Sequence, residues 1–170
     1  MSRTNLLIPI LISLFTFSLS LQVKAQAQSE TTDPLPIAIN LEQFGLQALK
    51  QNLPIAILFS GKGLKSTEKL KDEALYPILL SKELNGFALF TEIQVNDKNS
   101  TIDFYGEQLD NIEFKALYNV TSLPAVIFVN GEGDVITEQL LSGAYDYYHF
   151  YLKQSLNSAL KALNNPKRVP

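Results

Sequence analysis

The chain has 170 residues, of which 46% are hydrophobic and 18% are charged, and its formal net charge is −3. These values are typical of a folded globular domain and exclude an intrinsically disordered chain. Because the chain contains no cysteine, it has no redox thiols, disulfides, Cys-ligated zinc or iron–sulfur clusters. The negative net charge gives no electrostatic basis for binding nucleic acid.

The first residues have the layout of a secretory signal peptide. Arg3 supplies a positive start, residues 6–21 form an apolar run, and Ala25 and Ala27 have the spacing of a cleavage site. We therefore predict a signal peptide over residues 1–27 and a periplasmic or secreted protein. The alternative is an uncleaved membrane anchor, but the run contains a proline and is shorter than the roughly 20 residues that a spanning helix needs.

The rest of the chain divides into three parts by composition. Residues 28–39 are polar and Pro-rich, which predicts a flexible lead-in. Residues 40–163 carry the periodic apolar patterns of a folded domain, and residues 164–170 are predicted as a frayed tail.

The first predicted elements are a helix and a strand. Asn40 and Gln43 have capping-box spacing at the start of a helix. The apolar stripe of this helix consists of Leu41, Phe44, Ala48 and Leu49. Residues 55–59 (IAILF) form a continuous apolar run, which indicates a strand covered on both faces.

A polar turn over residues 60–63 leads into a predicted helix over residues 65–84, which Pro77 should kink. Residues 87–95 form the next strand. A short helix over residues 110–118 should then begin with a capping box between Asp110 and Glu113.

The last predicted elements are two strands and a helix. Residues 125–129 (AVIFV) and 135–140 are joined by a short Gly-rich link, which favours an antiparallel hairpin. Residues 146–163 form the final helix. Long helical crossovers imply parallel strands, so the fold class is α/β, with a small mixed β-sheet and helices on both faces.

One stretch carries a resemblance to a known family. Residues 59–70 read FSGKGLKSTEKL, which resembles the F-S-x-x-G-C-x-x-C-x-x-L turn of the thioredoxin superfamily, in particular of periplasmic bacterial thioredoxin-related proteins. The two cysteine positions of that motif fall on Leu64 and Thr67. Residues 74–79 and 114–129 also match, and Leu123-Pro124 lines up with the family's cis-proline. The resemblance spans residues 40–163.

The resemblance implies a thioredoxin-like fold and a peptide-docking face, but its redox activity cannot be carried over. Leu64 has no nucleophile, and Thr67 offers an alcohol without a nearby base. Two segments of the former active site would contact an exported protein or an extended peptide. Their residues are Leu64, Lys65, Ser66, Thr67, Ser122, Leu123 and Pro124. Alternatively, Pro124 serves only the geometry of its loop.

We therefore predict a non-catalytic protein- or peptide-binding module, with no cofactor and no metal. One alternative is an accessory subunit of a periplasmic thiol-redox system, with the thiols on its partner. Another is an enzyme of non-thiol chemistry that uses Thr67, Lys65 or the single histidine, His149. Nucleotide binding is not expected, since the turn lacks the Gly-Lys-Ser/Thr sequence of a phosphate loop.

Two clusters leave alternatives open. Four lysines lie close together at the start of the helix after the turn. They either form a surface for an acidic partner or belong to a solvated face, where they pair with neighbouring acidic residues. They are Lys62, Lys65, Lys69 and Lys71. The aromatic residues around His149 either bind a ligand or divide between the core and the solvent.

Overall fold

The computed structural model describes residues 34–143 and 145–170. The predicted signal peptide, residues 1–27, lies outside the described residues, as does the first part of the predicted lead-in. Within the described ranges, no helix combines the length and the apolar character needed to cross a membrane.

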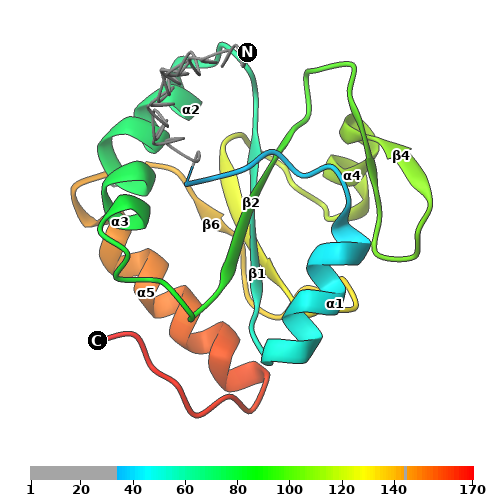
Figure 1. Cartoon of the computed structure of the whole chain (residues 1–170). Helices are drawn as coiled ribbons and strands as arrows, with labels where there is room; N and C mark the ends of the chain where they lie inside the picture. The colour runs from blue at the N-terminus through cyan, green and yellow to red at the C-terminus, as the bar shows by residue number, and fades with distance from the viewer. Residues whose placement is uncertain (1–33, 144) are drawn as a thin grey trace, which may run out of the picture. The chain divides into compact units, whose positions relative to one another are not determined.

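A mixed four-stranded sheet with strand order β2-β1-β5-β6 lies at the centre of the fold (Figure 1). β1 (Ile55–Ser60) and β2 (Leu89–Gln94) are parallel. β5 (Ala125–Val129) runs antiparallel to β1, and β6 (Leu140–Leu141) runs antiparallel to β5. Every residue of β1 is buried, which confirms the prediction of a strand covered on both faces, and every residue of β5 is buried as well.

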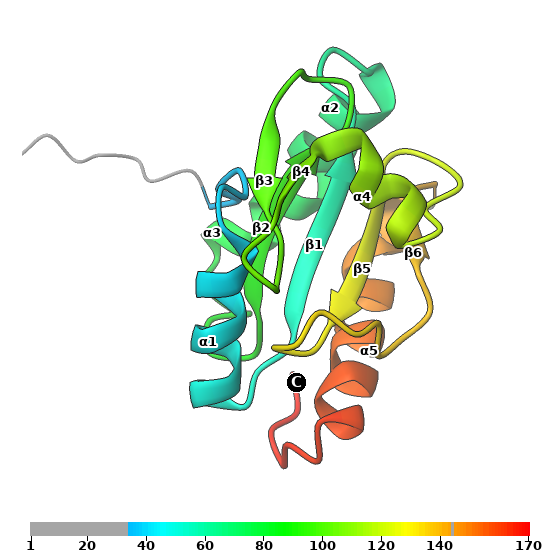
Figure 2. The ribbon, with the colours of Figure 1, turned by 90° about the vertical axis from the view of Figure 1, so that its right-hand side faces the viewer.

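Two groups of helices cover the two faces of the sheet (Figure 2). One face packs against α1 (Leu41–Gln51) and α4 (Asn111–Leu117). The other packs against α2 (Lys65–Leu70), α3 (Tyr76–Leu80) and α5 (Tyr145–Ala162). Because side chains alternate along a strand, Ile57 and Phe59 of β1 belong to the first core, and Leu58 belongs to the second.

α1 begins as the sequence predicts, since Asn40 Oδ1 accepts a hydrogen bond of 2.9 Å from the Gln43 amide. The predicted stripe is wrong at Leu49, which is 53% exposed. Gly45 is buried in its place, because α1 closely approaches the turn after β5. A Cβ atom at position 45 would lie 2.4 Å from the carbonyl oxygen of Gly131.

The helix predicted over residues 65–84 is three shorter pieces. A π-helical turn, η1 (Lys71–Leu75), separates α2 from α3, which ends at Leu80. The Tyr76 amide donates to the carbonyl of Lys71, five residues earlier. The next residue, Pro77, has no amide hydrogen and crowds the preceding turn, so the predicted kink takes the form of a widened turn.

Three local features differ from the sequence prediction. The sequence did not indicate the hairpin of β3 (Ser100–Ile102) and β4 (Gln108–Asp110). Asp110 makes no side-chain cap, because it is the last residue of β4, and the Asn111 amide donates to Asn99 instead. The strand expected at 135–140 reduces to one bridge at Val135 and the short β6, because four residues, 136–139, lie opposite only two of β5, Ile127 and Phe128.

The ends of the described chain pack more tightly than their composition suggests. Residues 36–38 run along the outer edge of β2, and Leu35 is buried. At the other end, the predicted frayed tail is hydrogen-bonded to the domain. Asn157 Nδ2 donates to the Val169 carbonyl (3.1 Å), its Oδ1 accepts from the Val169 amide (2.8 Å), and Asn165 donates to Asn52.

The tail contacts give a first prediction. Asn157→Ala removes both hydrogen bonds to Val169 and should lower the free energy of unfolding by about 1–2 kcal/mol. Hydrogen exchange at residues 165–170 should also accelerate. The matched control is Gln154→Ala, which removes a polar side chain of α5 without touching Val169. Equal exchange rates in the two variants would contradict the docking of the tail.

The aromatic residues around His149 divide between core and solvent. Tyr148 is 1% exposed, whereas Tyr147 and Phe150 are mostly exposed. Among the described residues, the Tyr148 hydroxyl is a buried side-chain group without a hydrogen-bond partner. Burial raises the pKa of this phenol well above its usual value.

Tyr148→Phe should therefore stabilise the protein by about 1 kcal/mol, since it removes a desolvated hydroxyl that makes no bond. The pH dependence has a definite sign. The phenol ionises near pH 10 in the unfolded chain and at higher pH in the folded chain, so stability falls as the pH rises above about 10. Urea unfolding between pH 8 and 11 should show a weaker fall in the variant. Tyr147→Phe, at an exposed ring, should change neither quantity.

Candidate functional site

The turn between β1 and α2 holds the first half of the predicted site. The Leu64 amide donates to the Gly61 carbonyl at 3.1 Å, and the Leu64 carbonyl accepts from the Thr67 and Glu68 amides. The Leu64 side chain folds over Gly61, where a Cβ atom would lie 2.3 Å from Leu64 Cδ1. Leu64 remains 40% exposed, so it offers apolar surface at the end of the sheet.

The predicted site residues that follow Leu64 differ in how far their side chains are exposed. Lys65 is exposed and Ser66 is half-buried. Thr67 is only 4% exposed, and its hydroxyl oxygen accepts from the Gly61 amide at 3.3 Å. Thr67 therefore closes the turn from inside rather than presenting an alcohol to a ligand.

Asn96, in the loop after β2, holds the turn from the side. Its Oδ1 accepts from the Lys62 amide at 2.6 Å, and its Nδ2 donates to the Lys62 carbonyl at 2.9 Å. The Lys62 ammonium also lies 3.6 Å from the Asp97 carboxylate. These contacts join residues more than 30 positions apart, so no local sequence pattern indicates them.

A buried carboxylate lies at the end of β1. Glu92 of β2 is fully buried and accepts hydrogen bonds from the Ser60 hydroxyl and from Gln94 Nε2. The Lys71 ammonium lies 2.5 Å from Glu92 Oε2. Lys71 stands on the π-helical turn and belonged to the predicted lysine cluster, so for this lysine the solvated-face interpretation is wrong. The sequence feature that could have indicated this buried ion pair is Glu92 itself, the one acidic residue in the apolar run of residues 87–95.

The second half of the predicted site comes before β5. The Leu123–Pro124 peptide bond is cis. Ser122 is exposed, Leu123 is half-buried against the core of α1 and α4, and Pro124 is buried. In the described part of the chain, the Leu123 amide and carbonyl make no hydrogen bond.

The strand register brings the two halves to the same end of the sheet. Phe59 is opposite Ala125, so Ser60 and the turn after it lie beside Pro124 and Leu123. The predicted residues thus lie just after the end of β1 and just before the start of β5, which are neighbouring strands. We call residues 64–67 and 122–124 the docking face.

The residues considered for catalysis are not assembled into one cavity. His149 on α5 lines two cavities, and neither includes Lys65 or Thr67. Among residues 34–143 and 145–170, no three acidic or histidine side chains form a group that could hold a metal ion. The hydroxyls of Ser60 and Thr67 are both engaged in hydrogen bonds within the domain.

The architecture is a thioredoxin-like α/β fold. It combines the parallel β1–β2 pair, the antiparallel β5 and β6, helices on both faces and a cis-proline directly before β5. Both cysteine positions of the redox motif are occupied by other residues, Leu64 and Thr67.

Comparison with solved structures finds two thioredoxins and an oxidoreductase among the similar proteins. A thioredoxin from Fasciola hepatica is 16% identical, with 72% of this chain and 96% of that chain covered and a TM-score of 0.48. A DsbH oxidoreductase is 25% identical, with 71% and 85% covered and a TM-score of 0.48. A mutant thioredoxin from Halobacterium salinarum is 13% identical, with 72% and 92% covered and a TM-score of 0.45. No protein-family model and no curated protein matches the sequence.

The buried ion pair gives a prediction for stability. Lys71→Met leaves the Glu92 carboxylate buried without a counter-charge, and should lower the free energy of unfolding by about 3–5 kcal/mol. The matched control is Lys69→Met, at an exposed lysine of α2 that pairs with Glu73 on the surface, and it should change the free energy of unfolding by less than about 1 kcal/mol. Chemical unfolding measures both.

A double variant separates the charge from the packing. Lys71→Met combined with Glu92→Leu removes both charges, and should recover most of the lost stability, because an apolar pair can replace a buried ion pair. If the double variant is no more stable than Lys71→Met alone, the buried charge is not the cause of the loss.

Proposed function

We propose that this protein is an exported, non-catalytic thioredoxin-fold module that binds an extended segment of another protein at its docking face. Export is inferred from the signal-peptide pattern of residues 1–27. The non-catalytic character is inferred from the lack of cysteine together with the engagement of the nearby hydroxyls in structural hydrogen bonds.

The observation that carries the proposal is the unpaired backbone of Leu123. A half-buried amide and carbonyl without partners in the described chain are ready to accept an added strand. In strand addition, main-chain hydrogen bonds supply affinity, and neighbouring side chains supply selectivity. The segment before β5 offers such a backbone at the end of the sheet.

Leu64 supports an apolar side-chain contact next to that backbone. It is 40% exposed and lies on the turn beside Leu123 and Pro124. Asn96 and Thr67 hold the turn by hydrogen bonds on two sides. A surface fixed before binding loses little conformational entropy when a ligand arrives, so even a small docking face can bind usefully.

The test measures binding of a permanently unfolded protein. Reduced, carboxymethylated α-lactalbumin carries no free thiol, so mixed disulfides cannot form. We expect fluorescence anisotropy to show saturable binding, and Leu64→Glu to weaken it by about tenfold, because the charge replaces the apolar contact.

The matched control is Leu80→Glu, which places the same charge at an exposed leucine of α3. It should bind the unfolded protein as the unaltered chain does. Circular dichroism and the thermal midpoint establish that both variants remain folded. Equal weakening by the two variants, or binding unchanged by Leu64→Glu, would contradict the docking face.

A further inference from the structure

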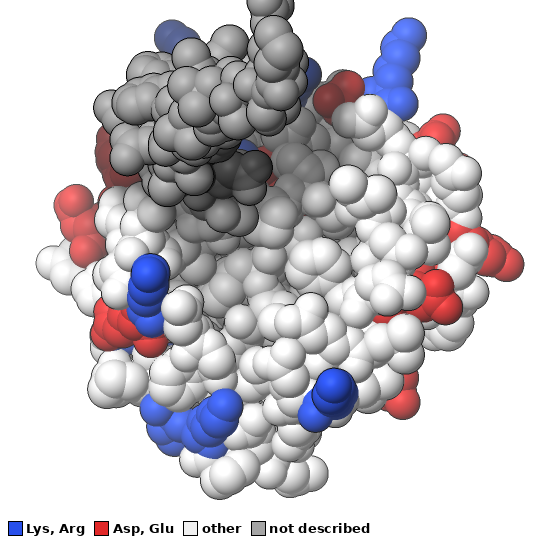
Figure 3. Space-filling view, in the orientation of Figure 1, with Lys and Arg blue, Asp and Glu red and all other residues white. Residues whose placement is uncertain are grey.

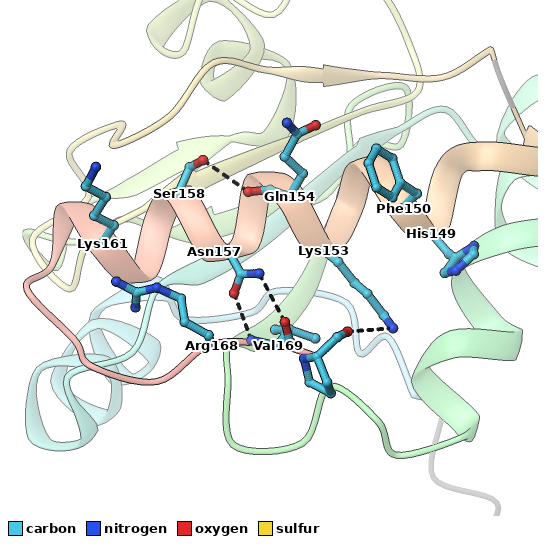
Figure 4. A pocket seen from close by; sticks show the side chains of 10 residues that line it. His149, Phe150, Lys153, Gln154, Asn157, Ser158, Lys161, Arg168 and Val169 are labelled. Atoms are coloured by element: carbon cyan, nitrogen blue, oxygen red, sulfur yellow. Dashed lines mark hydrogen bonds between the residues drawn. The ribbon is translucent and has the colours of Figure 1, made fainter.

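A groove runs along α5, and the C-terminal tail forms one of its walls (Figure 4). Its cavity volume is about 570 Å³, within the range of ligand-binding clefts. The hydrogen bonds between Asn157 and Val169 hold the tail beside the helix and so shape the groove. The sequence analysis predicted a frayed tail and therefore did not predict this groove.

The groove is positively charged in a protein of negative net charge. Its lining includes Lys153, Lys161 and Arg168 but no aspartate or glutamate side chain. Lys153 is neutralised locally, since it pairs with Glu83 and donates to the Pro170 oxygen. On the face shown in Figure 3, lysine and arginine side chains lie at the lower edge of the molecule, with acidic side chains close to some of them.

Two cations remain available to a ligand. The Lys161 ammonium makes no hydrogen bond or ion pair within the described residues, although the Lys161 carbonyl accepts from the Asn164 amide. Arg168 Nη1 donates to the carbonyls of Asn165 and Lys167, which fixes the guanidinium, while its other nitrogens have no partner there. In Figure 4 the Arg168 side chain lies alongside α5, toward the end of the helix that carries Lys161.

The other end of the groove is apolar. Phe150 is 56% exposed and lines the groove eleven residues before Lys161. At 1.5 Å per helical residue, this separation is about 16 Å. An extended peptide covers it with about five residues.

We propose that this groove binds an extended acidic segment of a partner protein, with carboxylates at Lys161 and Arg168 and an apolar side chain at Phe150. The charge of the lining selects an acidic ligand, and the length between the two ends matches a short peptide. The groove is separate from the docking face. Its tail wall is joined to the start of β1 through the bond from Asn165 to Asn52, whereas the docking face lies at the end of β1.

The probe is a fluorescent hexapeptide of alternating leucine and glutamate, titrated into the full chain. We expect saturable binding that weakens with added salt. Lys161→Glu should weaken it by about tenfold, and this variant should fold normally because Lys161 has no partner to lose. Lys98→Glu makes the same charge change at an exposed loop lysine and should leave the affinity within about twofold.

The outcomes decide between acidic-peptide recognition and other sources of binding. Equal affinity for a leucine–lysine hexapeptide, or no effect of Lys161→Glu, would overturn the proposal. Binding of decanoate without binding of the peptide would also overturn it and assign the groove to lipid carboxylates. Loss of binding in Lys161→Glu but not in Leu64→Glu separates this groove from the docking face.

Discussion

The buried carboxylate of Glu92 is the constraint on which the rest of the structure depends. A charged group without water needs a counter-charge and hydrogen-bond donors. Lys71 supplies the charge, and Ser60 and Gln94 supply further donors. The backbone of Glu92 also bonds residues 36 and 38, so this one residue links the start of the domain, two central strands and the segment after the turn.

The position of this network explains why the turn keeps its shape without thiols. Ser60, the last residue of β1, is held by Glu92, and the turn that follows is held by Thr67 and Asn96. The π-helical turn places Lys71 where it reaches the carboxylate. Polar contacts therefore fix a surface with an exposed leucine, Leu64, beside an unpaired backbone segment. A surface fixed in this way loses little conformational entropy when a ligand binds, as the proposed docking requires.

The sequence predicted the parts of the fold that follow from local patterns. The apolar runs at 55–59 and 125–129 were enough to identify strands, and Asn40 with Gln43 was enough to identify the start of α1. The predicted halves of the docking face also lie at one end of the sheet, because strand order determines that placement.

What the sequence could not provide depends on contacts between distant residues. Glu92 and Lys71 are 21 residues apart, and Asn165 and Asn52 are 113 apart. Composition alone predicted a frayed tail at 164–170, because its polar residues have no local partner. Their hydrogen-bond partners are on α5 and in the segment before β1, and these segments lie next to the tail only in the folded chain. The groove along α5 forms because the tail docks there, so it could not be predicted from the sequence either.

The most direct test of the central claim is an amide NMR titration of the isotope-labelled protein with the unfolded, alkylated protein as ligand. The account predicts that the Leu123 amide shifts strongly and becomes protected from hydrogen exchange, because it gains its missing hydrogen bond, and that Leu64 shifts with it. Saturable binding that leaves Leu123 unshifted and unprotected would contradict the account.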